Sequence, residues 1–175
     1  MTAGAAALPD AETVRAAHEL LAREAGHLDA QAWDDWLALY TEDASFWMPA
    51  WTDEHRLSAS PDRELSLMYC SARAGLEDRV WRVRSGLSAA SEPLPRTCHQ
   101  VTNSLVELLD GRSDALRVSS SWSCHVLRLK SRSQHLFFGR CEHRLRLEQG
   151  QWRIAGKTVV LMNDVIPTML DFYCV

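Results

Sequence analysis

The stretch LRVSSSWSCHV, residues 116–126, decides the fold. Its larger apolar side chains stand at alternate positions, which is the period of a β-strand with one buried and one exposed face. The stretch FFGRCEHRLRL, residues 137–147, has the same period, with charged side chains in between. Two such strands in succession predict an antiparallel pair whose polar face meets water or a partner. The side chains expected to face the core are Leu116, Val118, Ser120, Trp122, Cys124 and Val126, followed by Phe137, Gly139, Cys141, His143, Leu145 and Leu147.

Strand-like alternation extends on both sides of this pair. One more strand is expected from Thr97 to the Asp110-Gly111 turn signal, and another after the Gln149-Gly150 turn signal. The side chains predicted to share a face are Val101, Asn103, Leu105, Glu107 and Leu109 in the earlier strand, and Trp152, Ile154, Thr158 and Val160 in the later one. Residues 97–160 therefore predict a meander of four antiparallel strands.

Helical spacing dominates the part of the chain that precedes the meander. Asp10 is a helix-capping residue, and Gly26 is expected to end the helix that follows. Two further helices are predicted from apolar residues at helical spacing, the first carrying Trp33, Trp36, Leu37 and Tyr40, and the second Leu76, Val80 and Val83. Helices followed by an antiparallel meander indicate the α+β class.

An aromatic strand is expected between these helices, at residues 45–48. Pro49 ends it, and because proline cannot donate to a sheet ladder, the strand is predicted to lie at the edge of the sheet. Trp47 and Trp51 flank this proline and are the first candidates for contact with another subunit.

Length and charge limit the classes of function. The chain has 175 residues, enough for one domain, which we expect to span residues 13–175 after a flexible segment of residues 1–12. A net charge of −4 argues against nucleic-acid binding, and the N-terminal sequence shows neither a signal peptide nor a membrane span. We therefore expect a cytoplasmic protein without nucleic-acid or membrane partners, whose five cysteines are free thiols.

Metal and nucleotide motifs are incomplete in this sequence. Cys141-Glu142-His143 resembles half of the ligand set of a Rieske cluster, which needs two cysteines and two histidines. The only later cysteine is Cys174, and no histidine follows it. The seven histidines are dispersed, and glycine-rich phosphate loops are absent. We predict no metal site and no cofactor site in this chain.

One set of residues could support catalysis by a small cavity enzyme. Tyr40 and Asp43, after the second helix, could share a cavity with His99 and His143 from the strands and act as general acids and bases. This dehydratase- or isomerase-like reading is kept as the alternative function, beside that of a ligand-binding module. Turn formation by Asp43 and core packing of the histidines explain the same residues without chemistry.

Five blocks of the sequence have a recognisable pattern: LYTEDASFWMPAW (39–51), ELSLMY (64–69), GLEDRVWRVR (75–84), PRTCHQVTN (95–103) and NDVIPTMLDFYCV (163–175). Taken together, these blocks resemble the small (β) subunit of aromatic-ring-hydroxylating dioxygenases, closest to the benzoate and anthranilate branch. The resemblance implies a cone-like fold of the nuclear-transport-factor-2 (NTF2/SnoaL) type, in which helices cover a strongly curved sheet. The candidate residues for a subunit interface are Trp47, Trp51, Arg79 and Arg82.

The same resemblance implies a division of labour within a complex. The expected assembly is α3β3, with the small subunits associated as a trimer. The large α subunit would hold a Rieske 2Fe-2S cluster and a mononuclear Fe(II), with electrons supplied from NADH by a reductase. The small subunit would be structural and inactive alone, while the complex would convert an aromatic carboxylate to a cis-dihydrodiol. Benzoate is the expected substrate, and anthranilate and halobenzoates remain alternatives.

Overall fold

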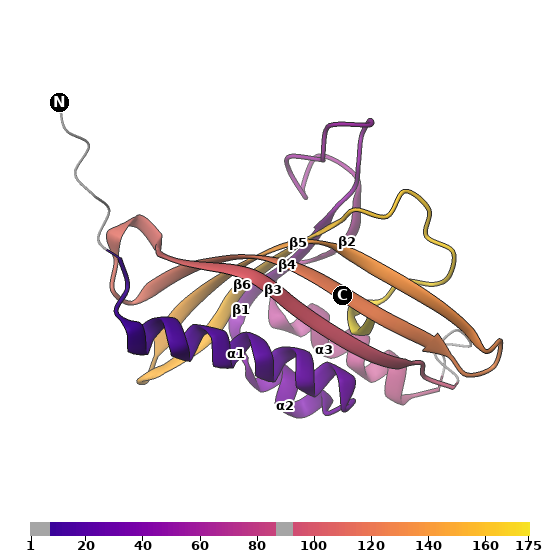
Figure 1. Cartoon of the computed structure of the whole chain (residues 1–175), viewed down its shortest axis with the longest axis horizontal. Helices are drawn as coiled ribbons and strands as arrows, with labels where there is room; N and C mark the ends of the chain where they lie inside the picture. Colours follow the sequence, from indigo (N-terminus) through magenta and orange to yellow (C-terminus); the bar gives the residue numbers. More distant parts are fainter. Residues whose placement is uncertain (1–7, 87–92) are drawn as a thin grey trace.

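The computed structural model describes residues 8–86 and 93–175, in which three helices pack on one face of a six-stranded sheet (Figure 1). The strand order is β2-β1-β6-β5-β4-β3. The helices are α1 (Ala11–Asp29), α2 (Trp33–Ala38) and α3 (Arg73–Arg84). The strands are β1 (Tyr40–Pro49), β2 (Ser66–Cys70), β3 (Arg96–Leu108), β4 (Ala115–Arg128), β5 (Ser133–Glu148) and β6 (Gln151–Leu161). The predicted α+β arrangement of N-terminal helices on a mostly antiparallel sheet is confirmed. Of the segment predicted to be flexible, residues 1–7 lie outside the described residues.

Helix α1 begins where its capping residue predicts and ends later than expected. The Asp10 carboxylate accepts a hydrogen bond from the Thr13 amide at 2.7 Å. The helix does not end at Gly26 but continues to Asp29. Leu28 is buried in the last turn, two helical turns beyond the buried Leu21. This core contact outweighs the low helix propensity of a single glycine.

Strand β1 corrects two of the predictions. Tyr40 does not end α2 but begins β1, and β1 is not an edge strand. It pairs antiparallel with β2, where Trp47 lies opposite Tyr69, and parallel with β6, where Trp47 lies opposite Thr158. Pro49 is compatible with this inner position because it is the last residue of the strand, where the register with β2 is already irregular.

The meander of β3 to β6 follows the predicted alternation until bulges change its phase. Every predicted core residue of β4 is buried, and in β5 the prediction fails only at the exposed Leu147. In β3, Asn103 has a φ of 52° and the pairing with β4 shifts between Thr102 and Leu105. Beyond this bulge Val106 is buried, while Leu105 is 58% exposed, opposite to the prediction.

A second bulge, in β6, has a larger consequence. Leu145 pairs with Ile154, but the preceding Arg144 pairs with Gly156, so Ala155 is an extra residue in β6. The alternation therefore changes phase after Ile154. The buried side chains after the bulge are those of Lys157, Val159 and Leu161, in place of the predicted Thr158 and Val160.

The C-terminal residues complete the core under the helices. Phe172 stacks on Trp36 with ring centroids 4.9 Å apart and meets Trp33 edge to face. Tyr173, Cys174 and Val175 are buried as well. The aromatic residues of α2 are therefore enclosed by the chain itself.

Candidate functional site

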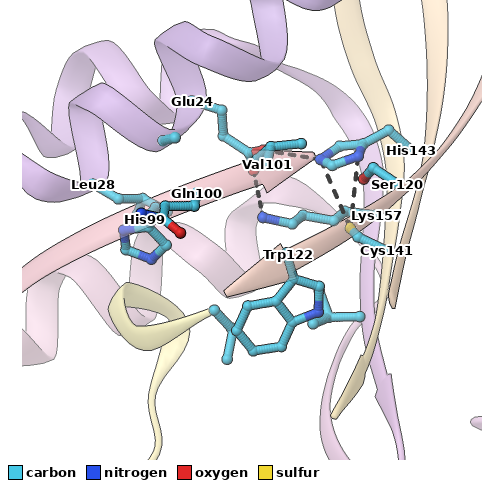
Figure 2. Close-up of a pocket in the computed structure, with 13 residues that line it drawn as sticks. Glu24, Leu28, His99, Gln100, Val101, Ser120, Trp122, Cys141, His143 and Lys157 are labelled. Carbon is cyan, nitrogen blue, oxygen red and sulfur yellow. Dashed lines mark hydrogen bonds and ion pairs between the residues drawn. The ribbon is translucent and has the colours of Figure 1, made fainter. Parts of the chain in front are cut away.

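A buried carboxylate, Glu24 of α1, is the centre of a polar cluster beneath the helix. Its Oε1 accepts hydrogen bonds from the Tyr40 hydroxyl and from Lys157 Nζ, the latter at 2.8 Å. Its Oε2 lies 2.9 Å from Nε2 of His143. The four side chains come from α1, β1, β5 and β6, so the cluster ties the first helix to the middle of the sheet (Figure 2 shows three of them). We call these four residues the Glu24 cluster.

Mutual interactions keep the acid and the bases of the cluster charged. Burial alone would raise the pKa of Glu24, but the Lys157 ammonium and the His143 imidazole lower it well below its usual range. Burial favours the neutral form of His143, yet the neighbouring Cys141 and Glu24 raise its pKa to about 9. The pKa of Lys157 is raised by Glu24 against the effect of burial, and that of Tyr40 is raised by burial and by the Glu24 carboxylate. The cluster is therefore built to hold charge, with its hydrogen bonds satisfied internally.

Cys141 and His143 share one face of β5, as predicted from the alternation. Cys141 Sγ lies 3.6 Å from His143 Nδ1, and both side chains are buried. The other neighbour of the imidazole is Glu24. Within residues 8–86 and 93–175, no group of three or more histidine, cysteine, aspartate or glutamate side chains converges in a way that could hold a metal ion.

A second polar pair joins the end of α1 to β3. His99 Nδ1 lies 2.6 Å from Asp29 Oδ1, and the Thr97 hydroxyl donates to the same carboxylate oxygen at 2.8 Å. The backbone amide of His99 also donates to Asp29. Burial raises the pKa of Asp29, but the hydrogen bonds from His99 and Thr97 lower it below its ordinary value overall.

The four candidate catalytic residues are not brought together. Tyr40 and His143 meet through Glu24, and His99 lies nearby with Asp29. Asp43 lies elsewhere, on the surface, where its Oδ1 accepts from Arg146 at 2.6 Å and from the Thr41 hydroxyl. The hydrogen bond from Arg146 is the main cause of the lowered pKa of this exposed carboxyl group. Tyr40 is buried at the start of β1, whereas Glu42 and Asp43 are exposed where the pairing of β1 with β6 is irregular.

A small cavity lies between the Glu24 cluster and His99 (Figure 2). The residues around it include Glu24, His99, Ser120, His143 and Lys157, but the surface that it exposes is almost entirely apolar, and its volume is about 20 Å³. For comparison, an internal cavity that binds benzene measures about 150 Å³. The cavity is therefore large enough for a water molecule and too small for an aromatic ring.

Two members of the site were not predicted from the sequence. Glu24 reads as one of many charged residues of an amphipathic helix, although it stands between the buried Leu20 and Leu28 at helical spacing. Lys157 is the only basic residue between Ile154 and Leu161, and its burial depends on the bulge at Ala155. The burial of Glu24 could have been predicted from the four-residue spacing of Leu20, Glu24 and Leu28, which places the three side chains on one face of the helix.

The residues proposed for a subunit interface lie at separate places. Trp47 is half-buried on β1 and donates to Ser66 Oγ, and Trp51 is 37% exposed and donates to the Leu161 carbonyl. On α3, Arg79 is paired with Asp171 at 3.1 Å, whereas Arg82 is exposed. No described helix is long and apolar enough to span a membrane.

Comparison with known proteins places this architecture in a family of subunits. The sequence model of the family described as "Ring hydroxylating beta subunit" matches residues 23–168. The chain therefore belongs to the ring-hydroxylating beta subunit family.

Individual relatives are similar to this chain along most of its length. The benzoate 1,2-dioxygenase subunit beta of Acinetobacter baylyi is 37% identical, over 97% of this chain and 98% of the relative. The 2-halobenzoate 1,2-dioxygenase small subunit of Burkholderia cepacia is 40% identical, over 86% and 89%. The crystal structure of the benzoate 1,2-dioxygenase beta subunit from Burkholderia mallei superimposes with a TM-score of 0.76 and 32% identity, over 97% and 99%. These matches confirm the fold, and with it the predicted role as a component of an aromatic-ring dioxygenase that is not itself the catalytic unit.

Proposed function

We propose that this chain is the structural small subunit of a multicomponent dioxygenase that converts benzoate, or a closely related aromatic carboxylate, to a cis-dihydrodiol. The observation that carries the proposal is the end-to-end match to a benzoate 1,2-dioxygenase subunit beta. Halobenzoate and anthranilate enzymes also have small subunits similar to this chain, which keeps the substrate class at aromatic carboxylates.

The catalytic metals of the complex belong, in this proposal, to a large α subunit. That subunit would hold a Rieske 2Fe-2S cluster and a mononuclear Fe(II), fed from NADH by a reductase in the cytoplasm. Hydroxylation of an aromatic ring needs delivered electrons and a metal that activates O₂. Family membership fits a small subunit with no cofactor of its own. The internal cavity supports this assignment, because its volume of about 20 Å³ leaves no room for the substrate ring at the Glu24 cluster.

Self-association as a trimer within an α3β3 complex is the second part of the proposal. The sheet face opposite the helices carries exposed apolar side chains on several strands. Tyr69 lies beside Trp47, and Met162 lies beside Phe138, to whose carbonyl its amide donates at 2.9 Å. The set comprises the exposed Leu67, Tyr69, Leu136, Phe138 and Met162 and the half-buried Trp47, which we call the outer apolar patch. An apolar patch of this kind on a sheet is typical of a surface covered by another subunit.

A reconstitution experiment tests the function. The chain is co-expressed with a cognate large subunit and a reductase, and benzoate, anthranilate and 2-halobenzoate are supplied separately. We expect cis-diol formation only when both subunits are present, with benzoate as the best substrate. Product formation by this chain alone would favour the cavity-enzyme alternative.

Light scattering tests the association. The parent chain is expected to be a trimer, and Phe138→Glu in the outer apolar patch is expected to shift it toward monomer. Trp81→Glu is the matched control, because Trp81 is 64% exposed but lies on α3, on the helical side of the molecule. A monomeric parent, or equal effects of the two substitutions, would contradict the assigned interface. Trp51 is proposed as a further contact residue within the trimer. Arg79 and Arg82 lie on α3 and are proposed for contact with the large subunit, with Arg82 the more accessible of the two.

A further inference from the structure

The connection between β1 and β2 is much longer than an antiparallel pair of strands requires. Hairpin loops usually have about two to five residues, whereas here residues 50–65 separate Pro49 from Ser66. We call residues 50–65 the arm. Ser58 is the only buried residue of the arm. Figure 1 shows the arm projecting from the sheet on the side away from the helices. A long connection that adds little to the core is usually functional.

Side-chain hydrogen bonds keep the arm ordered. The Trp51 indole donates to the Leu161 carbonyl at 2.7 Å and fixes the base of the arm to the end of β6. Asp53 Oδ1 accepts from two backbone amides of the turn that follows it, at 2.9 Å each. The Glu64 carboxylate accepts from two further amides within the arm. A segment that is ordered in advance loses little conformational entropy on association, which suits it to contact with a partner.

The arm presents carboxylates beside an apolar stripe. It contains four acidic residues and two arginines. Glu54 and Asp62 are exposed and have no ion-pair partner among the described residues. Leu65, Leu67 and Tyr69 stand at alternate positions leading into β2, so they share one face, and they are 82%, 43% and 37% exposed. We call the arm and this stripe the acidic surface.

The hairpin of β4 and β5 has the opposite charge. Between Asp114 and Glu142 the sequence contains no acidic residue and five lysines and arginines. Lys130 and Arg132 are exposed in the turn, and Arg140 is exposed on β5. None of these three forms an ion pair within residues 8–86 and 93–175. The exposed apolar residues of the hairpin are Leu129, Leu136 and Phe138. We call these six residues the basic surface.

A trimer needs two different surfaces that fit each other. A ring of three closes through head-to-tail contacts, so each copy offers one surface to the copy before it and another to the copy after it. The acidic and basic surfaces match in this sense, because their free charges have mainly opposite signs and both carry exposed apolar side chains. Both also extend into the outer apolar patch, which contains Leu67 and Tyr69 of the first and Leu136 and Phe138 of the second.

We propose that, in the trimer, the acidic surface of one copy lies on the basic surface of the next copy. This inference rests on the trimer of the proposed function and adds which surfaces meet. Glu54 and Asp62 face the basic side chains of the neighbouring hairpin, and the stripe ending at Tyr69 covers Leu136 and Phe138. The apolar contact supplies the buried area, and the charges set the order in which the two surfaces pair.

Reversal of the free charges tests this contact in the small subunit alone. The arm variant carries Glu54→Lys and Asp62→Lys, and the hairpin variant carries Lys130→Glu and Arg132→Glu. Light scattering is measured at low ionic strength, where surface charges are least screened. Each variant is expected to raise the concentration at which half of the trimer dissociates by about 10-fold or more. A combined variant with all four substitutions is expected to associate like the parent.

The control variant carries Arg23→Glu and Arg82→Glu, which are exposed on α1 and α3 and give the same change of charge as the hairpin variant. It is expected to remain a trimer. A trimeric parent whose hairpin variant dissociates no more than the control would overturn the inference and leave the proposed function intact. A monomeric parent would contradict the trimer itself. Arm and hairpin variants that stay trimeric but no longer bind a co-expressed large subunit would assign both surfaces to that subunit instead.

A mixture of the arm variant and the hairpin variant shows whether the contact joins different copies. In the mixture, the lysines of the reversed arm meet the glutamates of the reversed hairpin. The mixture is therefore expected to associate at concentrations at which each variant alone is dissociated. A mixture that stays dissociated would contradict a contact between copies.

Discussion

At the scale of single residues, Glu24 is the side chain on which most of the buried polar structure depends. It is the shared acceptor for Tyr40, His143 and Lys157, and all four side chains are buried. A buried ion pair adds little stability compared with apolar packing, but removal of one member leaves the other charge uncompensated. The stability of this chain is therefore more sensitive to loss of the acid than to loss of an equally charged residue on the surface.

Glu24→Gln is predicted to destabilise the chain by about 3–5 kcal/mol, because it leaves Lys157 and His143 buried without a negative partner. Glu19→Gln on the same helix is the control. Glu19 is exposed and pairs with Arg15 one turn away, an interaction worth about 0.3–0.5 kcal/mol. Urea unfolding measures both variants. Equal midpoints for the two variants would show that the Glu24 cluster does not carry the assigned charge.

His143 predicts how stability changes with pH. Its pKa is raised from 6.5 to about 9, so the folded state holds its proton more tightly than the unfolded state. The stabilisation is complete below about pH 6.5 and is lost as the pH rises through about 9. The groups that face the imidazole are Glu24 from α1, Cys141 from β5, and Lys157 and Tyr40, which share the Glu24 carboxylate.

Urea unfolding between pH 6 and 9.5 measures this effect. The parent chain should lose stability across the upper part of the range, and His143→Gln should show a flatter profile, since glutamine does not titrate. Parallel profiles for the two proteins would mean that His143 is not protonated in the folded state.

The sequence predicts part of this site and misses the rest for a physical reason. Simple alternation along β5 places Cys141 and His143 correctly on the core face, and no metal chemistry is needed to explain them. Glu24 and Lys157 are missed because charged residues on a helix or strand usually face water. They are buried because they pair with each other across the fold, and the sequence around either residue does not show that pairing.

At the scale of elements, β-bulges separate the predicted strands from the observed ones. The extra residue at Ala155 moves the Lys157 side chain to the core. The irregularity near Asn103 places Val106, instead of Leu105, on the core face. Strand existence and order follow from alternation, which is why the meander was predictable. A bulge inserts one residue without a clear local signal, so every face assignment beyond it is inverted. The prediction that β1 is an edge strand was wrong for another reason. Its parallel pairing with β6 joins segments far apart in the sequence, and no local pattern indicates such a pairing.

Two glycines give opposite predictions because one has space and the other has none. A Cβ at Gly139 in β5 would lie 1.9 Å from the Val160 carbonyl oxygen, whereas a Cβ at Gly26 in α1 would meet nothing within 4 Å. Gly139→Ala should therefore cost about 3 kcal/mol or more, at the upper end for overpacking. Gly26→Ala should stabilise the chain by up to about 1 kcal/mol. Denaturant unfolding distinguishes the two, and a tolerated Gly139→Ala would contradict the pairing of β5 with β6 at this point.

At the scale of the whole molecule, the two faces of the sheet have different roles. The helical face is closed by α1 to α3 and the C-terminal residues, and its cavity holds no more than water-sized ligands. The opposite face carries the outer apolar patch. A chain closed on one side and carrying an apolar patch on the other is suited to assembly rather than to binding an aromatic substrate in its own interior. This arrangement agrees with membership of the ring-hydroxylating beta subunit family.

The most direct test of a structural role is turnover per assembled complex. Asp43→Ala and His99→Ala are introduced separately into the small subunit, and benzoate conversion is normalised to intact, metal-replete complex. Both variants are predicted to stay within a few-fold of the parent, because the chemistry is assigned to the large subunit. Loss of a true general acid or base would lower the rate by about 10²- to 10⁴-fold. A loss of that size in fully assembled complex would contradict the account and move these residues from packing to mechanism.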